Sequence, residues 1–465
     1  MFIRKTQNFL KVYYKINKFS STPLRRAEAV LSEQSVEEIL NTDNEYNELA
    51  NEFLHLSEKH RCIVIQPYVK WGPRKLSITP HEQLEEAIAL IKTLPSWKVV
   101  DTVVVPLESL EKKTLFKSGS MEKLTNMITQ NPEITAVFIN TSNLKSITNS
   151  ILQKNFRIPI LDRYKIVMQI LKMHAKSKYA KLQVALAELY FVQRKSQASN
   201  TTEALKLVFQ NREQKIKKAI LDLRNERMLL RNKRRKLEYP VIAVVGYTNA
   251  GKTCLIKALT GEETLQPRNQ LFATLDVTVH LGMLPSGLEV LFVDTVGFLS
   301  DLPTKLIECF VATLEDAILA DVILHVEDLA SSCFDYKRDH VFKTLSDLSK
   351  ETGCKNIMDK VLNVGNKCDL VQEIKDKDLL HISAKSGIGI EDLRFRLEKE
   401  ILKVTSRHIL TIKIPNGGDE IRWLYKNATV VSENADENDS QIMKTKVIIT
   451  DSNLKKFKHN FVNSK

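Results

Sequence analysis

Short apolar runs alternate with helix-like segments over residues 61–161. The runs at 62–66, 99–106, 135–140 and 157–161 are rich in β-branched residues and have the length of buried strands. Between them, apolar positions recur every three to four residues over 81–94, 120–129 and 143–153, which predicts amphipathic helices. This alternation predicts a small, mostly parallel α/β domain. It contains no recognisable catalytic constellation.

From about residue 163 to residue 235 the pattern becomes helical throughout. No Pro or Gly interrupts it, and apolar residues keep helical spacing on both sides of a polar break at 195–202. We therefore expect two long helices packed as a hairpin over 162–237. Between Lys206 and Lys236, twelve Lys or Arg residues face only three acidic residues. This charge fits a solvated face and equally fits a contact with RNA.

The chain has 465 residues, enough for several domains, and a net charge of +13. The excess positive charge lies in the basic hairpin and in residues 1–27. Residues 1–27 hold seven basic and no acidic residues. The latter segment lacks the continuous apolar core of a secretory signal, and its mixture of apolar residues with Ser and Thr predicts a mitochondrial transit peptide. A basic tail without a targeting role is the alternative. Residues 28–60 are expected to be a variable flank.

Two classes of protein are excluded by composition. No stretch approaches the roughly 20 apolar residues of a membrane-spanning helix, so we expect no membrane insertion. The six cysteines lie far apart without a C-x-x-C pair, which argues against a disulfide scaffold or a zinc knuckle and favours a reducing compartment.

The strongest chemical signal is a phosphate loop. An apolar strand, VIAVV, leads into G-x-x-x-x-G-K-T over residues 246–253, and a helical segment follows. The glycines let backbone N–H groups turn inward around an anion, and the helix presents its positive end. Lys252 is expected to reach the β- and γ-phosphates, and the Thr253 hydroxyl to bind Mg²⁺.

Three further motifs follow in the order that a GTP switch requires. Asp294 ends an apolar strand in D-T-V-G, where the amide of Gly297 can sense a γ-phosphate. Asp369 of N-K-C-D can accept hydrogen bonds from two guanine donors, and the S-A-K segment 383–385 can offer an amide to guanine O6. Together the motifs predict a GTP-binding domain over 238–403.

Two assignments stay open on spacing alone. The segment 271–279 contains Thr274 and Thr278, and either hydroxyl could close over Mg²⁺ and the γ-phosphate. Asn249 could help to hold K⁺ beside the phosphates, or it could simply form the loop.

These motifs resemble those of the HflX-type GTPases. The resemblance rests on GYTNAGKT, LFATLD, DTVGFL, NKCD and SAK, and on the segment 160–189, which is similar to the family's N-terminal domain entering its helical hairpin. It covers about residues 60 to 405. The C-terminal segments RWLYKNATVV and KVIITDSNLKKF are similar to the eukaryotic mitochondrial branch.

The resemblance implies a factor that acts on the large ribosomal subunit and its RNA, in splitting and recycling of mitochondrial ribosomes or in maturation of the subunit, in the mitochondrial matrix. It also favours Thr274 over Thr278 as the second Mg²⁺ ligand. Two departures stand out. No glycine lies between Gly119 and Gly246, where the family has a glycine-rich loop after residues 181–189, and VTVH at 277–280 replaces paired threonines.

The expected architecture is an α/β protein. A P-loop GTPase domain with a mostly parallel sheet follows the small α/β domain and the basic hairpin, and a small α/β appendage over 404–465 ends the chain, which is taken as a monomer. The expected cofactors are GTP or GDP and Mg²⁺, with K⁺ as the option that Asn249 leaves open. Lys252, Thr274 and Gly297 are the expected catalytic residues, and Thr253 and Thr274 the metal ligands. The expected nucleotide-binding residues are Gly246, Tyr247, Thr248, Asn249, Ala250, Gly251, Lys252, Thr253, Phe272, Ala273, Thr274, Leu275, Asp276, Asp294, Thr295, Val296, Gly297, Asn366, Lys367, Cys368, Asp369, Ser383, Ala384 and Lys385.

Two other functions fit the same motifs. The protein could be a non-enzymatic RNA-binding assembly chaperone with structural GTP, or a regulatory GTPase with a protein partner. Phe298 bears on the choice, because many small GTPases have at this position a Gln that orients the attacking water. Phe cannot do so, and we expect slow turnover until a partner supplies or orders the missing group.

Guanine specificity should depend on Asp369. The Asp369→Asn variant loses a charged acceptor worth about 1.5–3 kcal/mol, so GTP affinity should fall more than tenfold while affinity for xanthosine nucleotides rises. Titration of the unaltered protein and the variant with GTP and with xanthosine triphosphate measures both affinities. Unchanged GTP affinity in the variant would show that another residue recognises the base.

Overall fold

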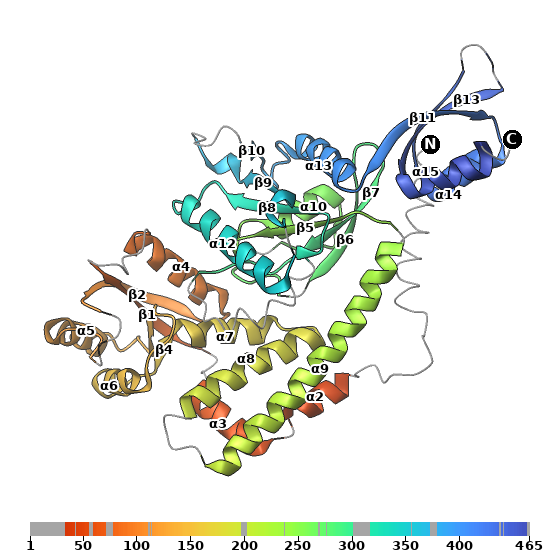
Figure 1. Ribbon diagram of the computed structural model, residues 1–465. Helices are drawn as coiled ribbons and strands as arrows, with labels where there is room; N and C mark the ends of the chain where they lie inside the picture. The colour runs from red at the N-terminus through yellow and green to blue at the C-terminus, as the bar shows by residue number, and fades with distance from the viewer. Residues whose placement is uncertain are drawn as a thin grey trace.

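Figure 1 shows the computed structural model, in which an N-terminal α/β domain, long helices, a G domain and a small C-terminal domain follow one another along the chain. The structure describes residues 33–462 apart from 42, 55–58, 71–77, 110–111, 113, 197–201, 237, 268–269, 276, 301–316, 355, 373–378, 437–438 and 440. The predicted transit peptide, Asp276 and the polar segment 197–201 therefore lie outside the described residues.

The N-terminal domain is a four-stranded parallel sheet in the order β2-β1-β3-β4. Its strands are β1 (Arg61–Val69), β2 (Lys98–Leu107), β3 (Ala136–Ile139) and β4 (Ile160–Asp162). Helix α4 (Pro80–Thr93) packs on one face, while α5 (Ser118–Gln130) and α6 (Ser146–Phe156) pack on the other. These elements confirm the strands and helices predicted from the hydrophobic pattern.

The helical region corrects one expectation. Instead of two helices it contains three: α7 (Arg163–His174), α8 (Lys178–Ser196) and α9 (Glu203–Lys236). The first run breaks because the Ser177 hydroxyl accepts a hydrogen bond from the Ala180 N–H at 3.1 Å and so caps the start of a new helix. Helices α8 and α9 pack against each other, with Phe209 and Ile216 of α9 buried.

Two helices lie in the segment for which the sequence analysis names no element. Helices α2 (Glu33–Asn41) and α3 (Asn44–Leu54) pack against α8, and α2 also contacts α9. The buried Arg212 of α9 donates to Asp43 Oδ2 at 3.2 Å and to the Leu40 carbonyl at 2.7 Å, and its guanidinium lies 4.1 Å from the centre of the Tyr46 ring. These contacts join the acidic N-terminal helices to the basic helix.

The G domain is a six-stranded sheet in the order β10-β9-β8-β5-β7-β6, parallel except for the edge strand β6. Its strands are β5 (Val241–Gly246), β6 (Thr278–Met283), β7 (Glu289–Asp294), β8 (Val322–Asp328), β9 (Val361–Asn366) and β10 (Leu380–His381). Helices α10 (Lys252–Thr260) and α13 (Ile390–Val404) pack on one face, and α12 (Phe334–Thr352) on the other. Two 3₁₀ turns, Met358–Lys360 and Cys368–Leu370, flank β9.

The α12 face of the G domain shares one hydrophobic core with the N-terminal domain. This core contains residues of α4, α7, α8 and α9 together with Val245, Phe272 and Val341 of the G domain. The two domains are therefore packed against each other through buried apolar contacts, not merely joined by a linker.

The C-terminal domain is a three-stranded antiparallel sheet in the order β11-β13-β12. Its elements are β11 (Arg407–Pro415), α14 (Asp419–Asn427), β12 (Thr429–Ala435), β13 (Ile442–Thr450), α15 (Asp451–Phe457) and a π-helical turn at Lys458–Val462. Both helices pack on the sheet. Among the described helices, none is long and apolar enough to cross a membrane.

Candidate nucleotide-binding site

The phosphate loop connects β5 to α10 and has an unusual backbone. Gly246, Asn249 and Gly251 have φ values of 157°, 62° and 92°. A Cβ at Gly246 would lie 2.3 Å from the Val326 carbonyl oxygen, and one at Gly251 would lie 2.3 Å from the Asn366 Nδ2. Both conformation and space therefore require glycine at the two ends of the loop.

Three carbonyl groups of the loop accept hydrogen bonds from other motifs. The Phe298 N–H donates to Gly246 at 3.1 Å, Lys367 Nζ donates to the Asn249 carbonyl at 2.8 Å, and Asn366 Nδ2 donates to the Ala250 carbonyl at 2.9 Å. The Thr248 N–H in turn donates to Phe298 at 2.7 Å. The structure thus brings the phosphate loop, D-T-V-G-F and N-K-C-D together, although they are far apart in the sequence.

Lys252 is buried at the start of α10. Its Nζ donates to the carbonyls of Gly246 at 3.2 Å and of Tyr247 at 3.1 Å, so the ammonium group lies inside the loop. Burial lowers the pKa of Lys252 to about 8, and the nearby Asp294 carboxylate opposes this shift. An anion bound in the loop would raise the pKa of Lys252 again, because it would add a second negative charge beside the ammonium group.

Three oxygen-bearing side chains converge beside this lysine. Thr253 Oγ1 donates to Asp294 Oδ2 at 2.6 Å, Thr274 Oγ1 donates to the same atom at 3.1 Å, and the two hydroxyls lie 3.1 Å apart. Thr278 instead lies 2.8 Å from the Nε2 of His280, at the start of β6. Of the two candidates that spacing left open, Thr274 lies next to Thr253, whereas Thr278 contacts His280.

This cluster fits a hard divalent cation. Asp294 is buried, and burial raises the pKa of its carboxyl group above the usual value. Its Oδ1 has no hydrogen-bond partner among the described residues. Hydroxyl and carboxylate oxygens are the ligands that Mg²⁺ prefers, and it commonly completes its shell with water and substrate phosphates.

The segment after Asp294 lies directly on the phosphate loop. A Cβ at Gly297 would lie 2.8 Å from Thr248 Cα and 3.0 Å from Lys252 Nζ. Thr295 is fully buried and donates to the Val244 carbonyl at 2.7 Å, and Val296 is buried as well. Phe298 is 7% exposed and forms a parallel bridge with Tyr247, so its aromatic ring packs inside the protein.

The two segments that we expect to recognise guanine meet at the ends of β9 and β10. The buried Asn366 accepts a hydrogen bond from the Ala384 N–H at 3.0 Å and so joins N-K-C-D to S-A-K as well as to the phosphate loop. Ser383 is buried, whereas the side chains of Asp369 and Lys385 are exposed. The Cys368 N–H donates to the Ile382 carbonyl at 3.1 Å. Asp369 is therefore open to a base.

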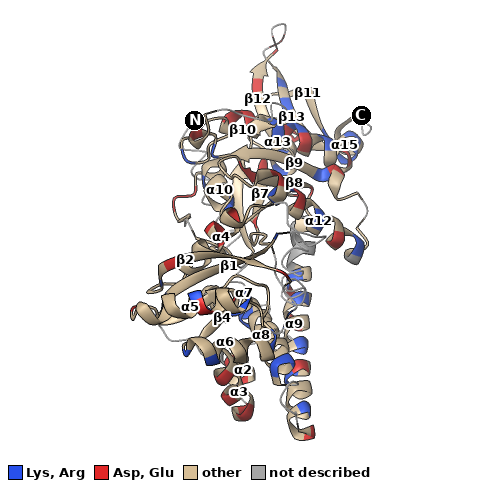
Figure 2. Ribbon diagram, turned by 90° about the vertical axis from the view of Figure 1, so that its left-hand side faces the viewer, with Lys and Arg blue, Asp and Glu red and all other residues tan. Residues whose placement is uncertain are grey.

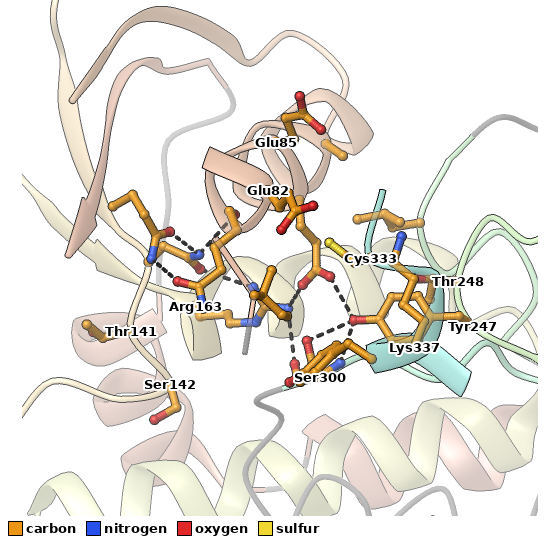
Figure 3. A pocket seen from close by; sticks show the side chains of 18 of the residues that line it. Glu82, Glu85, Thr141, Ser142, Arg163, Tyr247, Thr248, Ser300, Cys333 and Lys337 are labelled. Carbon is orange, nitrogen blue, oxygen red and sulfur yellow. Dashed lines mark hydrogen bonds and ion pairs between the residues drawn. The ribbon is translucent and has the colours of Figure 1, made fainter. Parts of the chain in front are cut away.

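Some expected binding residues face elsewhere. Phe272 and Leu275 are buried in the core that the two domains share, while Ala273 is exposed. The side chain of Tyr247 points into the N-terminal domain and not into the phosphate loop (Figure 3). The sequence analysis also missed Asp328, whose Oδ2 lies 2.6 Å from Lys367 Nζ. Its place at the end of an apolar strand was the only available clue.

Comparison with known proteins agrees with this geometry. Residues 81–171 match the family model "GTP-binding GTPase N-terminal", and residues 241–367 match "50S ribosome-binding GTPase". The chain is 39% identical to "Putative GTP-binding protein 6" of Xenopus laevis, covering 87% of this chain and 80% of the relative. It is 32% identical to "GTPase HflX" of Caldanaerobacter subterraneus, covering 73% of this chain and 82% of the relative. The chain belongs to the HflX family of GTPases.

The structural comparison is weaker. A GTP-binding protein of Sulfolobus solfataricus, solved in complex with GDP, is 21% identical to this HflX-family protein. The match covers 74% of this chain and 99% of that one, with a TM-score of 0.40.

Nucleotide binding to this HflX-family protein should depend on pH through Lys252. Phosphates bind the charged lysine, whose pKa in the free protein is about 8. GDP affinity should therefore be nearly constant below about pH 8 and fall by up to about tenfold per pH unit above it, because the neutral amine must first take up a proton. Calorimetry in two buffers of different ionisation enthalpy would measure affinity and proton uptake together. A constant affinity without proton uptake from about pH 7 to pH 9 would contradict the assignment.

The role of Asn249 stays a prediction. Its positive φ suits a loop-forming Asn. If its side chain also helps to hold K⁺, GTP hydrolysis should be severalfold faster in KCl than in NaCl at equal ionic strength, and Asn249→Ala should remove the difference. Equal rates of the unaltered protein in the two salts would leave only the loop-forming role.

Proposed function

We propose that this HflX-family protein is a GTP-hydrolysing factor that acts on the large subunit of the mitochondrial ribosome. It would act in ribosome splitting and recycling, in assembly of the large subunit, or in both. GTP binding and hydrolysis would set its association with the subunit and its release. The observation that carries this proposal is the basic helix α9, and the description of the matching family model, a 50S ribosome-binding GTPase, supports it.

Helix α9 presents a long positive surface. Figure 2 shows Lys and Arg recurring along its length, in contrast to the mixed charges of the G domain. The exposed basic side chains include Lys206, Lys215, Lys217, Lys218 and Arg224. Lys206 and Lys217 pair with acidic residues of the same helix, whereas no ion pair within the described residues involves Lys215 or Lys218. A regular array of exposed cations favours binding to RNA phosphates.

The chemistry of the proposed reaction follows from the cluster beside Lys252. Thr253, Thr274 and Asp294 would hold Mg²⁺, which when bound neutralises phosphate charge. Lys252 would bind the terminal phosphates, Gly297 would offer its amide to the γ-phosphate, and Asp369 would select guanine. Phe298 has no polar atom in its side chain, so the protein itself offers no water-orienting group at this position. We therefore propose that the large subunit supplies or orders that group.

Mitochondrial targeting is part of the proposal. The basic, acid-free composition of residues 1–27 supports it, and so does the similarity of the C-terminal segments to the mitochondrial branch.

The test is sedimentation of the tagged protein with purified mitochondrial large subunits, in a non-hydrolysable GTP analogue and in GDP. We expect co-migration only with the GTP analogue. Turnover should rise at least tenfold when subunits are added, which corresponds to about 1.4 kcal/mol off the barrier. Fast turnover by the isolated protein, unchanged by subunits, would contradict the proposal. Binding without any turnover would favour the assembly chaperone.

A charge-reversal pair tests the role of α9. Lys215→Glu combined with Lys218→Glu should weaken subunit binding and reduce the slope of log affinity against log salt by about 2, because two phosphate contacts are lost. The control combines Lys154→Glu on α6 with Lys343→Glu on α12, two exposed lysines whose reversal changes the net charge equally. An equal loss of subunit binding in the α9 variant and in the control would exclude a specific contact through α9. Binding insensitive to salt would favour a regulatory GTPase with a protein partner.

A further inference from the structure

The segment VTVH at 277–280, where this chain departs from the family pattern, places a buried histidine on the edge strand of the G-domain sheet. His280 lies on β6 and is 8% exposed. Its Nδ1 lies 2.7 Å from Glu262 Oε2, and its Nε2 lies 2.8 Å from Thr278 Oγ1. Glu262 follows the end of α10 by two residues. We therefore call Glu262, His280 and Thr278 the α10–β6 tie.

The tie contains a hydrogen bond to a charged group. Burial opposes ionisation of Glu262, but hydrogen bonds from Thr264 and His280 hold the pKa of its carboxyl group below the usual value. The Thr264 hydroxyl donates to Glu262 Oε1 at 2.7 Å. An ionised carboxylate can only accept hydrogen bonds, so the Nδ1 of His280 is the donor to it. The Nε2 is paired with the Thr278 hydroxyl, which can donate or accept, and both ring nitrogens therefore have partners.

Close packing also keeps β6 against α10 and β7. A Cβ at Gly282 of β6 would lie 2.5 Å from Phe292 Cε2 and 3.4 Å from Thr260 Cγ2 at the end of α10, so a larger residue would push the strand away. The antiparallel pairing of β6 with β7 places Thr278 opposite Asp294. The tie and the strand pairing together fix the start of β6 beside Asp294, the carboxylate of the candidate Mg²⁺ site.

The start of β6 is also the downstream end of the segment that carries Thr274. Three residues separate Thr274 from Thr278, and one of them, Leu275, is buried in the core that the domains share. The Thr274 hydroxyl lies 3.1 Å from both Asp294 Oδ2 and Thr253 Oγ1, where it can bind Mg²⁺ together with them. So short a connection leaves Thr274 little freedom to move away while Thr278 stays in place.

We infer that Glu262 and His280 are positioning residues of the GTPase site, which act through Thr278 to hold Thr274 where it can bind Mg²⁺ beside a γ-phosphate. The tie then favours GTP over GDP, because only GTP offers a γ-phosphate to the closed segment. A hydroxyl that is already in position loses less conformational entropy on binding, which raises the affinity for Mg²⁺ and GTP together. The inference rests on the role that we propose for Thr274.

The test compares dissociation constants of the full chain for GDP and for a non-hydrolysable GTP analogue over a series of Mg²⁺ concentrations. Glu262→Ala and His280→Phe should each lower the preference for the analogue over GDP by at least about threefold, the effect of losing one ordinary hydrogen bond. The Mg²⁺ concentration for half-maximal binding of the analogue should rise by a similar factor. The double variant should show no more than the larger single effect, since both changes break one tie.

Two further variants serve as references. Glu263→Ala is the matched control, because Glu263 is the next residue along the chain, is exposed and forms no ion pair with another residue that the structure describes. It should leave the preference unchanged. Thr274→Ala removes the hydroxyl on which the tie is inferred to act, and should lower the preference at least as much as the double variant does.

The outcomes separate the inference from the role of Thr274. An unchanged preference in Glu262→Ala and His280→Phe, with a lowered preference in Thr274→Ala, would overturn the inference alone. An unchanged preference in Thr274→Ala would contradict the role of Thr274 itself. Equal weakening of both nucleotides in the tie variants, the signature of a merely structural role, would overturn the inference too, as would an equal shift in Glu263→Ala or additive effects in the double variant. Thermal unfolding of each variant, followed by circular dichroism, shows that the compared proteins are folded.

Discussion

A loop that turns its N–H groups toward a phosphate must leave its carbonyl groups to other partners. In this protein the carbonyls of Gly246, Asn249 and Ala250 accept hydrogen bonds from Phe298, Lys367 and Asn366. Buried backbone oxygens without partners destabilise a fold, so the hydrogen bonds to the buried Gly246 and Ala250 carbonyls stabilise the loop and connect it to these distant motifs. The motifs of a GTP switch are therefore also the structural supports of one another.

The segments around the phosphate loop also depend on contacts with the N-terminal domain. The hydrophobic core beneath α12 continues into α4, α7 and α8, and Phe272 and Leu275 of the switch segment are buried in it. The polar contacts of Arg163 and Glu86 lie at the border of this core. Apolar burial is non-directional and provides most of the binding between the domains, whereas the few buried polar contacts define one relative position.

The sequence predicted the strands well, because strands of a parallel sheet are buried on both faces and appear as uninterrupted apolar runs. The sequence also identified motifs that the structure brings together at the phosphate loop, because each motif is short and local. The break between α7 and α8 was missed because one Ser177 cap decides it. The contact of Tyr247 with Glu86 was missed because 161 residues separate the two, and no periodicity in a single sequence reports such a pair.

Helix α9 has a mechanical consequence. It is a single helix of 34 residues, which makes it about 51 Å long, and it ends just before β5, the strand that carries the phosphate loop. Figure 1 shows it running from the tip beside α3 to the G domain. Such a rod acts as a lever arm: a tilt of about 10° at the β5 end would displace the far tip by about 9 Å. A rearrangement of a few ångströms beside bound GTP or GDP would thus become a displacement of about 9 Å at the far end of α9, roughly the size of one nucleotide of an RNA chain.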